Sequence, residues 1–333
     1  MADRFEQHAP KPAIYVIHEN EVWVEPLRHA FGRQSLPYVE WHLDQGVLDL
    51  ASEPPKGIFY NRMSASSHTR GHRYAPELTA AVLAWLRRHG RAVVNGERAL
   101  QLEVSKVAQY EALAALDIET PRTIAVVGRE HIVAAAERIG FPLILKHNRA
   151  GKGLGVRLFL TRDGLQDHVQ SAAFEDPIDG ITLVQRYINA PEPFITRVEF
   201  VGGKFVYAVR VDTSEGFELC PADVCAIDAK QTANVCPAVA PGDKFRILEG
   251  FNHPLLPAWE RFLRSNDIGI AGVEFIVNES GCCFTYDVNT NTNYNAEAEA
   301  KSSGPRGMDT IAAYLGGLLR EHNEGSAYRY RAA

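Results

Sequence analysis

No apolar run in this sequence approaches the ~20 residues that a membrane-spanning helix needs. Basic residues do not predominate either, because 35 Lys and Arg stand against 41 Asp and Glu, a formal net charge of −6. Surfaces that bind nucleic acid neutralise phosphates with clustered Lys and Arg, so neither a nucleic acid nor a membrane is expected as a partner. Residues 1–11 lack the apolar core of a signal peptide and are expected to form a loose tail.

Cysteines are few and lack the spacing of a structural zinc site. Of the five, Cys282 and Cys283 are adjacent, while Cys220, Cys225 and Cys236 form no CxxC pair. Reduced thiols in a cytoplasmic protein are therefore expected.

The composition is that of a globular protein, with 46% hydrophobic and 23% charged residues, and 333 residues are too many for one ordinary core. Over residues 1–96, short apolar runs and a helical pattern predict an α/β domain with a mostly parallel sheet. A second unit is expected over 97–188, and a third, richer in antiparallel hairpins, over 189–333. No internal repeat and no low-complexity segment is found.

The expected strands are short and apolar, and they cover 13–18, 36–42, 57–62, 92–95, 123–127, 141–146, 156–160, 181–188, 195–201, 204–211, 270–278 and 282–289. The expected helices cover 76–89, 97–116, 130–139, 163–173, 257–265 and 308–321. Asp163 is interpreted as the cap of its helix. Gly202 and Gly203 suit the positive φ angles of a tight hairpin.

Lys146 ends an expected strand, and the loop after it has Gly151, Gly153 and Gly155 at alternate positions. Glycines let backbone amides turn inward around an anion, and a lysine adds a point charge, so a phosphate cradle is the natural use. The loop is not a Walker A motif, because Lys152 is followed by glycine instead of Ser or Thr. Taken alone, the segment is equally compatible with a flexible hairpin whose glycines are incidental.

The last expected hairpin carries Glu274 on one strand and Asp287 and Asn289 on its partner. Side chains two apart on a strand share a face, and pairing can bring Glu274 beside them. Two carboxylates and an amide oxygen are ligands that suit Mg²⁺, and a cation explains why like charges stay close. The alternative is that these residues face solvent on an edge hairpin.

These segments together resemble the ATP-grasp superfamily and, within it, RimK-type and glutathione-synthase-like carboxylate-amine ligases. The resemblance covers nearly all of 13–319, and its blocks follow the family's order: 93–96 with 105–106, 141–146 with the glycine loop, 182–188, and the hairpin of Glu274, Asp287 and Asn289. It implies an α/β (α+β) ATP-grasp fold. The expected parts are a Rossmann-like pre-ATP-grasp domain over 1–96, a small central lid subdomain over 97–188, and an antiparallel C-terminal subdomain over 189–333.

The resemblance also implies cofactors, ATP with Mg²⁺ or Mn²⁺, and roles for residues. ATP phosphates are expected to meet Lys106 and Lys146, under a loop of Gly151, Lys152, Gly153 and Gly155. The adenine is expected beside Gln185, Arg186, Tyr187 and Ile188, and the ribose near Glu192. Arg197 and Arg210 are the expected catalytic arginines at the transferred phosphoryl group, and the expected metal ligands are Glu274, Asp287 and Asn289.

Some positions depart from the family's pattern. Glu274 stands where Asp is common, and Asp287 stands where Glu is common, so one ligand is longer and the other shorter. Thr196 replaces the usual acidic residue before Arg197. After Asn289, residues 290–295 replace a Pro-containing turn, and Asn291 and Asn293 are expected to contact substrate.

Arg62 precedes a polar segment with several serines and is interpreted as a clamp for a substrate carboxylate, with an ordinary polar loop as the alternative. His18, His68 and His72 could assist deprotonation of an amine, although a core or surface histidine is the commoner role.

The function that the resemblance implies is amide formation. ATP phosphorylates a carboxylate, and an amine then displaces the phosphate. An amino acid or small peptide is the expected substrate, with a protein terminus as another, and a dimer or tetramer is the expected assembly. Two alternatives remain open: a kinase that stops at phosphoryl transfer, and a nucleotide-binding protein without catalysis.

Overall fold

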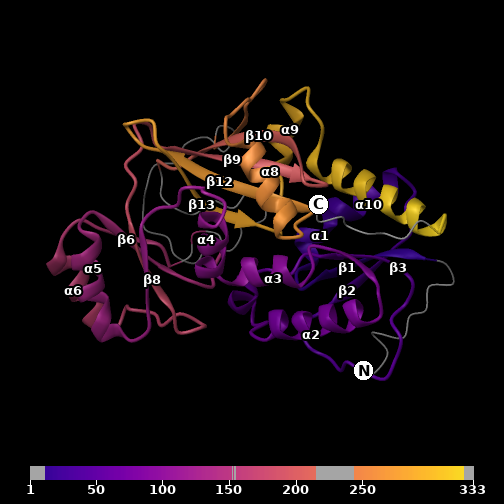
Figure 1. Cartoon of the computed structure of the whole chain (residues 1–333), viewed down its shortest axis with the longest axis horizontal. Helices are drawn as coiled ribbons and strands as arrows, with labels where there is room; N and C mark the ends of the chain where they lie inside the picture. The colour runs from indigo at the N-terminus through magenta and orange to yellow at the C-terminus, as the bar shows by residue number, and fades with distance from the viewer. Residues whose placement is uncertain (1–11, 152, 154, 215–243, 326–333) are drawn as a thin grey trace.

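The structure is a computed structural model that describes residues 12–151, 153, 155–214 and 244–325. Its strands form three sheets, and each sheet is built from one stretch of the chain. In Figure 1 the second sheet lies at the left with its helices, the first at the lower right, and the third above them. The expectations for residues 1–11, Lys152, Cys220, Cys225 and Cys236 concern residues outside those described.

The first sheet is parallel, as the alternating pattern predicts. Its order is β2-β1-β3-β4, with strands β1 (Ala13–His18), β2 (Tyr38–His42), β3 (Gly57–Asn61) and β4 (Ala92–Val94). Every residue of β1 and β3 is buried, because helices cover both faces. Helix α2 (Ala75–Arg88) packs on one face, and helices α1 (Glu21–Arg33) and α10 (Gly307–Asn323) pack on the other.

Helix α1 is not among the expected elements. Pro26 lies inside it, and an internal proline costs ~3 kcal/mol. Burial outweighs this cost. The helix turns Trp23, Leu27 and Phe31 into the core, and Asn20 caps its start by accepting a hydrogen bond from the backbone amide two residues on.

The helix expected over 97–116 is instead two helices, α3 (Glu97–Val104) and α4 (Lys106–Ala114). Ser105 separates them with an extended backbone at φ −142° and ψ 107°, and its hydroxyl accepts a hydrogen bond from the amide of Ala108. The break is stable because the serine satisfies an amide that has no partner inside the helix. As a result, Lys106 is the first residue of α4.

The second sheet is antiparallel and has the order β5-β8-β6-β7. Its strands are β5 (Thr123–Val126), β6 (Leu143–His147), β7 (Arg157–Phe159) and β8 (Thr182–Arg186), and helices α5 (Ile132–Ile139) and α6 (Arg162–Gln170) share its core. The cap of α6 is Thr161, whose hydroxyl accepts from the amide of Gly164. The expected cap, Asp163, is wrong, because that residue lies inside the first turn.

The third sheet is also antiparallel, in the order β11-β10-β9-β12-β13. Its strands are β9 (Phe194–Val201), β10 (Lys204–Asp212), β11 (Phe245–Ile247), β12 (Ile270–Val277) and β13 (Cys283–Asn289). Gly202 and Gly203 form the predicted turn, with φ of 62° and 68°. Helix α8 (Leu256–Ser265) shares its core with α3 and α4. Strand β11 and helix α9 (Ala296–Ala300) were not expected, because such short elements show no period.

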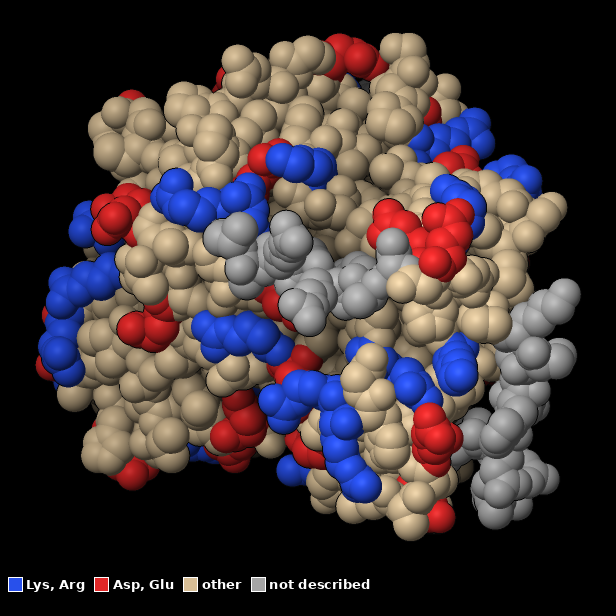
Figure 2. Space-filling view, turned by 45° about the vertical axis from the view of Figure 1, so that its right-hand side comes forward, with Lys and Arg blue, Asp and Glu red and all other residues tan. Residues whose placement is uncertain are grey.

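Helix α10 returns the chain to the first sheet, where Ile311 and Leu315 join the core of β1, β3 and α1. The division of the chain at residues 96 and 188 stays a prediction. None of the helices in the described ranges is long and apolar enough to cross a bilayer. On the face that Figure 2 shows, basic and acidic side chains are interspersed.

Glu40, on β2, joins this strand to α1 by an ion pair, and its substitution tests how helix and sheet are held together. Its carboxylate accepts two hydrogen bonds of 2.6 Å from Arg28, and His18 lies 3.2 Å away. Burial opposes the charge, but the hydrogen bonds from Arg28 and the proximity of His18 outweigh it and lower the pKa of Glu40 from 4.5 to about 2.

Glu40→Gln should therefore lower the free energy of unfolding by about 1 kcal/mol near neutral pH, a figure reduced for partial exposure. Because the folded-state pKa is depressed, this stabilisation is present above about pH 4.5 and is lost as the pH falls toward about 2. Urea unfolding at several pH values checks the result, with the exposed Glu25→Gln as control. A gap between wild type and Glu40→Gln that does not close in acid would contradict it.

Candidate active site

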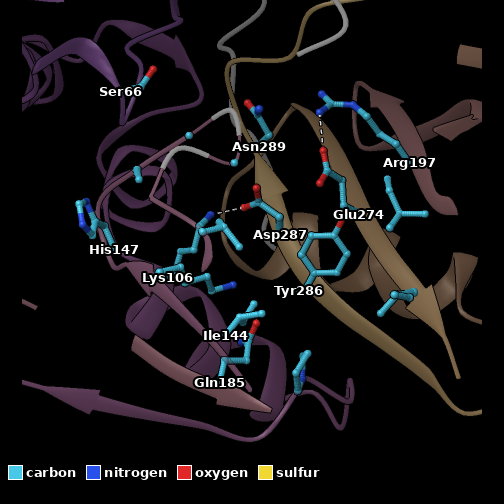
Figure 3. A pocket seen from close by; sticks show the side chains of 18 of the residues that line it. Ser66, Lys106, Ile144, His147, Gln185, Arg197, Glu274, Tyr286, Asp287 and Asn289 are labelled. Atoms are coloured by element: carbon cyan, nitrogen blue, oxygen red, sulfur yellow. Dashed lines mark hydrogen bonds and ion pairs between the residues drawn. The ribbon is translucent and has the colours of Figure 1, made fainter. Parts of the chain in front are cut away.

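A pocket lies between the second and third sheets, and helix α1 and the loop after β3 also contribute to its wall. Trp23, Ser64 and Ser66 come from the first part, and Glu103 comes from helix α3. The remaining polar side chains come from α4, from strands of the second and third sheets and from the segments that follow those strands (Figure 3). Fourteen of the predicted site residues line the pocket: Lys106, Lys146, Gly151, Gly153, Gln185, Arg186, Tyr187, Ile188, Arg197, Glu274, Asp287, Asn289, Asn291 and Asn293.

Lys106 and Asp287 meet across the pocket. The lysine Nζ donates to Asp287 Oδ1 at 2.6 Å, so the start of α4 is joined to the end of β13. Burial opposes the charge on the amine, but the Asp287 carboxylate outweighs it, and the pKa of Lys106 is raised. Lys106 is therefore a permanent cation in the pocket.

Lys146 is held by a second group of polar side chains. Its Nζ donates to the hydroxyl of Tyr110 at 2.5 Å, and Gln185 Nε2 lies 3.1 Å from the same oxygen. The Tyr110 hydroxyl in turn donates to the carbonyl of Tyr286 at 2.9 Å. Tyr110 therefore positions both Lys146 and Gln185, although sequence reasoning did not single it out.

Arg197 is buried in the third sheet between two carboxylates. Its Nε donates to Glu199 at 2.5 Å and its Nη1 to Glu274 at 2.9 Å. Thr292 accepts a third hydrogen bond from it at 2.5 Å. The guanidinium lies across Gly272, where an added Cβ would stand 2.4 Å from Nη2, so a larger residue there would displace Arg197.

The three expected metal ligands converge as predicted on one face of the hairpin. Glu274 lies opposite Asp287, and Asn289 follows two residues along β13 (Figure 3). Burial raises the pKa of Glu274 despite the opposing charge of Arg197, and the charge of Asp287 adds a smaller effect in the same direction as burial. A divalent cation would relieve this repulsion, so two carboxylates and an amide oxygen fit Mg²⁺ with phosphates as further ligands. Within the described residues there is no group of three or more His, Cys, Asp or Glu side chains that could hold a metal ion. A metal held by Glu274 and Asp287 would therefore need other kinds of ligand as well.

A family model described as the RimK-like ATP-grasp domain matches residues 104–218. This stretch includes both pocket lysines, the glycine loop and Arg197. This central part of the chain matches an ATP-grasp domain.

Several known proteins are similar to this chain in sequence or in fold. A D-alanine–D-alanine ligase of Geobacter sulfurreducens is 27% identical over 199 residues, which are 59% of this chain and 57% of that protein. The similarity therefore spans little more than half the length of that relative. The crystal structure of a RimK domain ATP-grasp protein of Sphaerobacter thermophilus has a TM-score of 0.62 at 19% identity, covering 92% of this chain and 99% of the other. The ATP-grasp ligase PsnB, complexed with a minimal precursor, has a TM-score of 0.63 at 14% identity, covering 94% and 100%.

Arg210 does not lie beside Arg197, because a bulge interrupts the pairing of β10 with β9. Phe205 lies opposite Phe200, but Tyr207 lies opposite Glu199, so β10 has one extra residue. An extra residue moves every later side chain to the other face of the sheet.

The displaced Arg210 lies opposite Thr196, on the face away from Arg197. It stacks on Phe194 and forms an ion pair of 2.8 Å with Glu192. Neither member of this pair lines the pocket, and Gly155 does not line it either. The expected contacts of Arg210 with the phosphoryl group and of Glu192 with the ribose are therefore not supported by this structure.

The interpretation of Arg62 as a substrate clamp is also wrong. Arg62 is only 2% exposed, and its guanidinium donates to the backbone carbonyls of Trp23 and Thr292 and to the side chains of Asn291 and Asn293. Because its N–H groups are used in these hydrogen bonds, the guanidinium of Arg62 cannot also bind a substrate carboxylate.

The glycine loop contacts the first part of the chain. Arg149, at its start, forms an ion pair of 2.6 Å with Glu77 of α2 and donates to the carbonyl of Arg73. A Cβ on Gly151 would lie 3.6 Å from Ser66. The sequence did not indicate this role of Arg149. Its position next to the glycine loop was the only feature that could have suggested it.

Proposed function

We propose that this protein is an ATP-dependent ligase that joins a carboxylate to an amine through an acyl phosphate, releasing ADP and phosphate. The observation that supports this most is the convergence of Lys106, Lys146 and Arg197 with Glu274 and Asp287 in one pocket. Cations can neutralise a triphosphate there, while the carboxylates hold its metal.

The nucleotide would lie with its base against the apolar wall formed by Ile144, Val156, Ile188 and Ile276. Its phosphates would meet Lys106 and Lys146 beneath the glycine loop. Mg²⁺ held by Glu274, Asp287 and Asn289 would supply charge neutralisation to the phosphate oxygens.

In the first step a substrate carboxylate oxygen attacks the γ-phosphorus of ATP, and the bond to the β-phosphate oxygen breaks to release ADP. In the second step the amine attacks the acyl carbon, and phosphate leaves as the amide forms with loss of one proton. Lys106, Lys146 and Arg197 stabilise the negative charge that moves during both steps. The loop fastened by Arg149 excludes water, which would otherwise hydrolyse the acyl phosphate.

Amino acids or peptides are the substrates we propose. The Geobacter relative is named for ligation of D-alanine, and the PsnB structure is of a complex with a minimal precursor. The expected dimer or tetramer stays a prediction.

The experiment mixes purified protein with ATP, Mg²⁺ and an equimolar mixture of L- and D-amino acids and dipeptides. Phosphate release that depends on the mixture, with an amide product detected by mass spectrometry, would support the proposal. Hydroxylamine separates the ligase from a kinase, because it converts an acyl phosphate into a hydroxamate. Release of ADP without amide or hydroxamate would favour a kinase, and no dependence on the mixture would overturn the proposal.

Lys146→Met should raise the half-saturating ATP concentration about tenfold, because a charged hydrogen-bond donor to phosphate is lost. Methionine keeps most of the length of the lysine side chain, so the fold should persist. Lys204→Met is the matched control, since Lys204 is an exposed lysine paired with Glu260. Equal ATP dependence of Lys146→Met and wild type would contradict a role in phosphate binding.

A further inference from the structure

Two asparagines after strand β13, Asn291 and Asn293, line the pocket with side chains only 5% and 8% exposed. The Oδ1 atom of Asn291 accepts a hydrogen bond from Arg62 Nε at 3.3 Å, and that of Asn293 accepts one from Nη2 at 2.9 Å. A guanidinium has donors only, so the amide atom that faces it must be the oxygen. Each NH₂ group is therefore turned away from Arg62.

These NH₂ groups have no hydrogen-bond partner within the part of the chain that the structure describes. An amide nitrogen that has no partner in the protein is available as a hydrogen-bond donor to a ligand. The pocket is where such a ligand would lie, because both side chains form part of its wall.

The surroundings of Arg62 favour an oxygen ligand. Its four acceptors are neutral, and among the described residues no carboxylate pairs with it. A buried cation on the oxygen side of an amide polarises the N–H groups on the other side and strengthens them as donors. An ammonium group would meet donors there and be repelled, whereas a carboxylate would be bound.

The position of this donor pair relates it to the reaction centre. The backbone amide of Asn291 donates to Oδ1 of Asn289 at 2.9 Å, which joins the pair to an expected metal ligand. Thr292, between the two asparagines, bonds Arg197 and Glu199. An oxygen held by Asn291 would therefore lie beside the groups that act on phosphate.

We propose that the NH₂ groups of Asn291 and Asn293, oriented by Arg62, bind carboxylate oxygens of the amino-acid substrate. Arg62 is a positioning residue that acts through the two amides. This inference rests on the proposed ligase function and specifies which end of the substrate faces residues 291–293.

The test is Asn291→Asp, which keeps an oxygen toward Arg62 but replaces the donor NH₂ with a second oxygen. With Mg²⁺-ATP and the mixture of amino acids and dipeptides, its half-saturating mixture concentration should rise at least about tenfold. The half-saturating ATP concentration should stay within about twofold of wild type. The thermal midpoint should be unchanged or higher, because the new carboxylate pairs with Arg62. Asn293→Asp should act in the same direction.

Asn295→Asp is the matched control, because Asn295 caps α9 and aspartate caps equally well. It should leave both half-saturating concentrations unchanged. In an Arg62→Met background, where the amides are free to rotate, Asn291→Asp should add less than about threefold.

The two proposals fail in different ways. If wild type releases no phosphate in response to the mixture, the ligase proposal fails and this inference fails with it. If wild type responds and Asn291→Asp is saturated by the same mixture concentration, the donor pair alone is wrong. A folded Asn291→Asp protein with selectively weakened use of the mixture supports the assignment.

Discussion

Asp287→Asn should lower kcat by about 100-fold or more. The amide can still accept a hydrogen bond from Lys106, so the side chain keeps its place at the end of β13. It loses the negative charge that pairs with Lys106 and would hold Mg²⁺. Phosphate release measured across a range of Mg²⁺ concentrations checks this, and the half-saturating Mg²⁺ concentration should rise with the fall in kcat.

Asp176→Asn provides the control, because Asp176 is an exposed aspartate whose partner, Arg129, lies outside the pocket. Its kcat should stay within about twofold of wild type. A fully active Asp287→Asn protein would remove the central member of the proposed metal site. Unfolding by urea should be measured for both variants, so that a loss of structure is not mistaken for a loss of metal.

The sheets could be predicted because their signals are local. Apolar runs bounded by turn residues predicted all strands except β11, and two adjacent glycines predicted the β9–β10 turn. The resemblance to ATP-grasp ligases identified pocket residues that are far apart in sequence, such as Lys106 and Asp287. Local periodicity alone would not have brought those two together.

Other features depend on contacts that a single sequence does not reveal. Helix α1 forms despite Pro26 because its apolar face is buried under α10, which lies near the end of the chain. Arg62 looked like a surface clamp because a charged residue among serines usually faces water, yet tertiary packing buries it on Asn291 and Asn293.

The position of Arg210 differs from the predicted one for a purely geometric reason. Without the bulge after Phe205, Arg197 and Arg210 would lie on the same face of the β9–β10 hairpin, as the resemblance implies. One unpaired residue places the two arginines on opposite faces of the hairpin, and no residue type in the strand predicts the bulge. Alternation along a strand therefore predicts the face on which a side chain lies only as far as the first bulge.

Arg197→Met should lower the free energy of unfolding by about 3–5 kcal/mol near neutral pH. Arg197 is 4% exposed and neutralises Glu199 and Glu274, which are 1% and 7% exposed. Methionine fills similar space but leaves two buried carboxylates without a cation. Arg320→Met, at an exposed position of α10, should change the stability by less than about 0.5 kcal/mol.

The destabilisation by Arg197→Met should depend on pH with a defined sign. Burial raises the pKa of Glu199 and of Glu274 even in the presence of Arg197, and loss of the guanidinium should raise both further. A carboxyl group whose folded-state pKa is raised binds protons more tightly when folded, so its contribution to stability falls as the pH rises. The deficit should therefore be largest above neutral pH and should shrink in acid.

Adding Glu199→Gln to Arg197→Met should recover part of the lost stability, because it removes one uncompensated charge while Thr292 can still donate to the amide oxygen. Urea unfolding of the single and double variants at about pH 8 and about pH 5.5 measures both effects. A deficit that is independent of pH and unaffected by the second substitution would mean that Arg197 stabilises the sheet by packing. The two carboxylates would then tolerate burial without a positive charge, and the electrostatic account of the pocket would have to be abandoned.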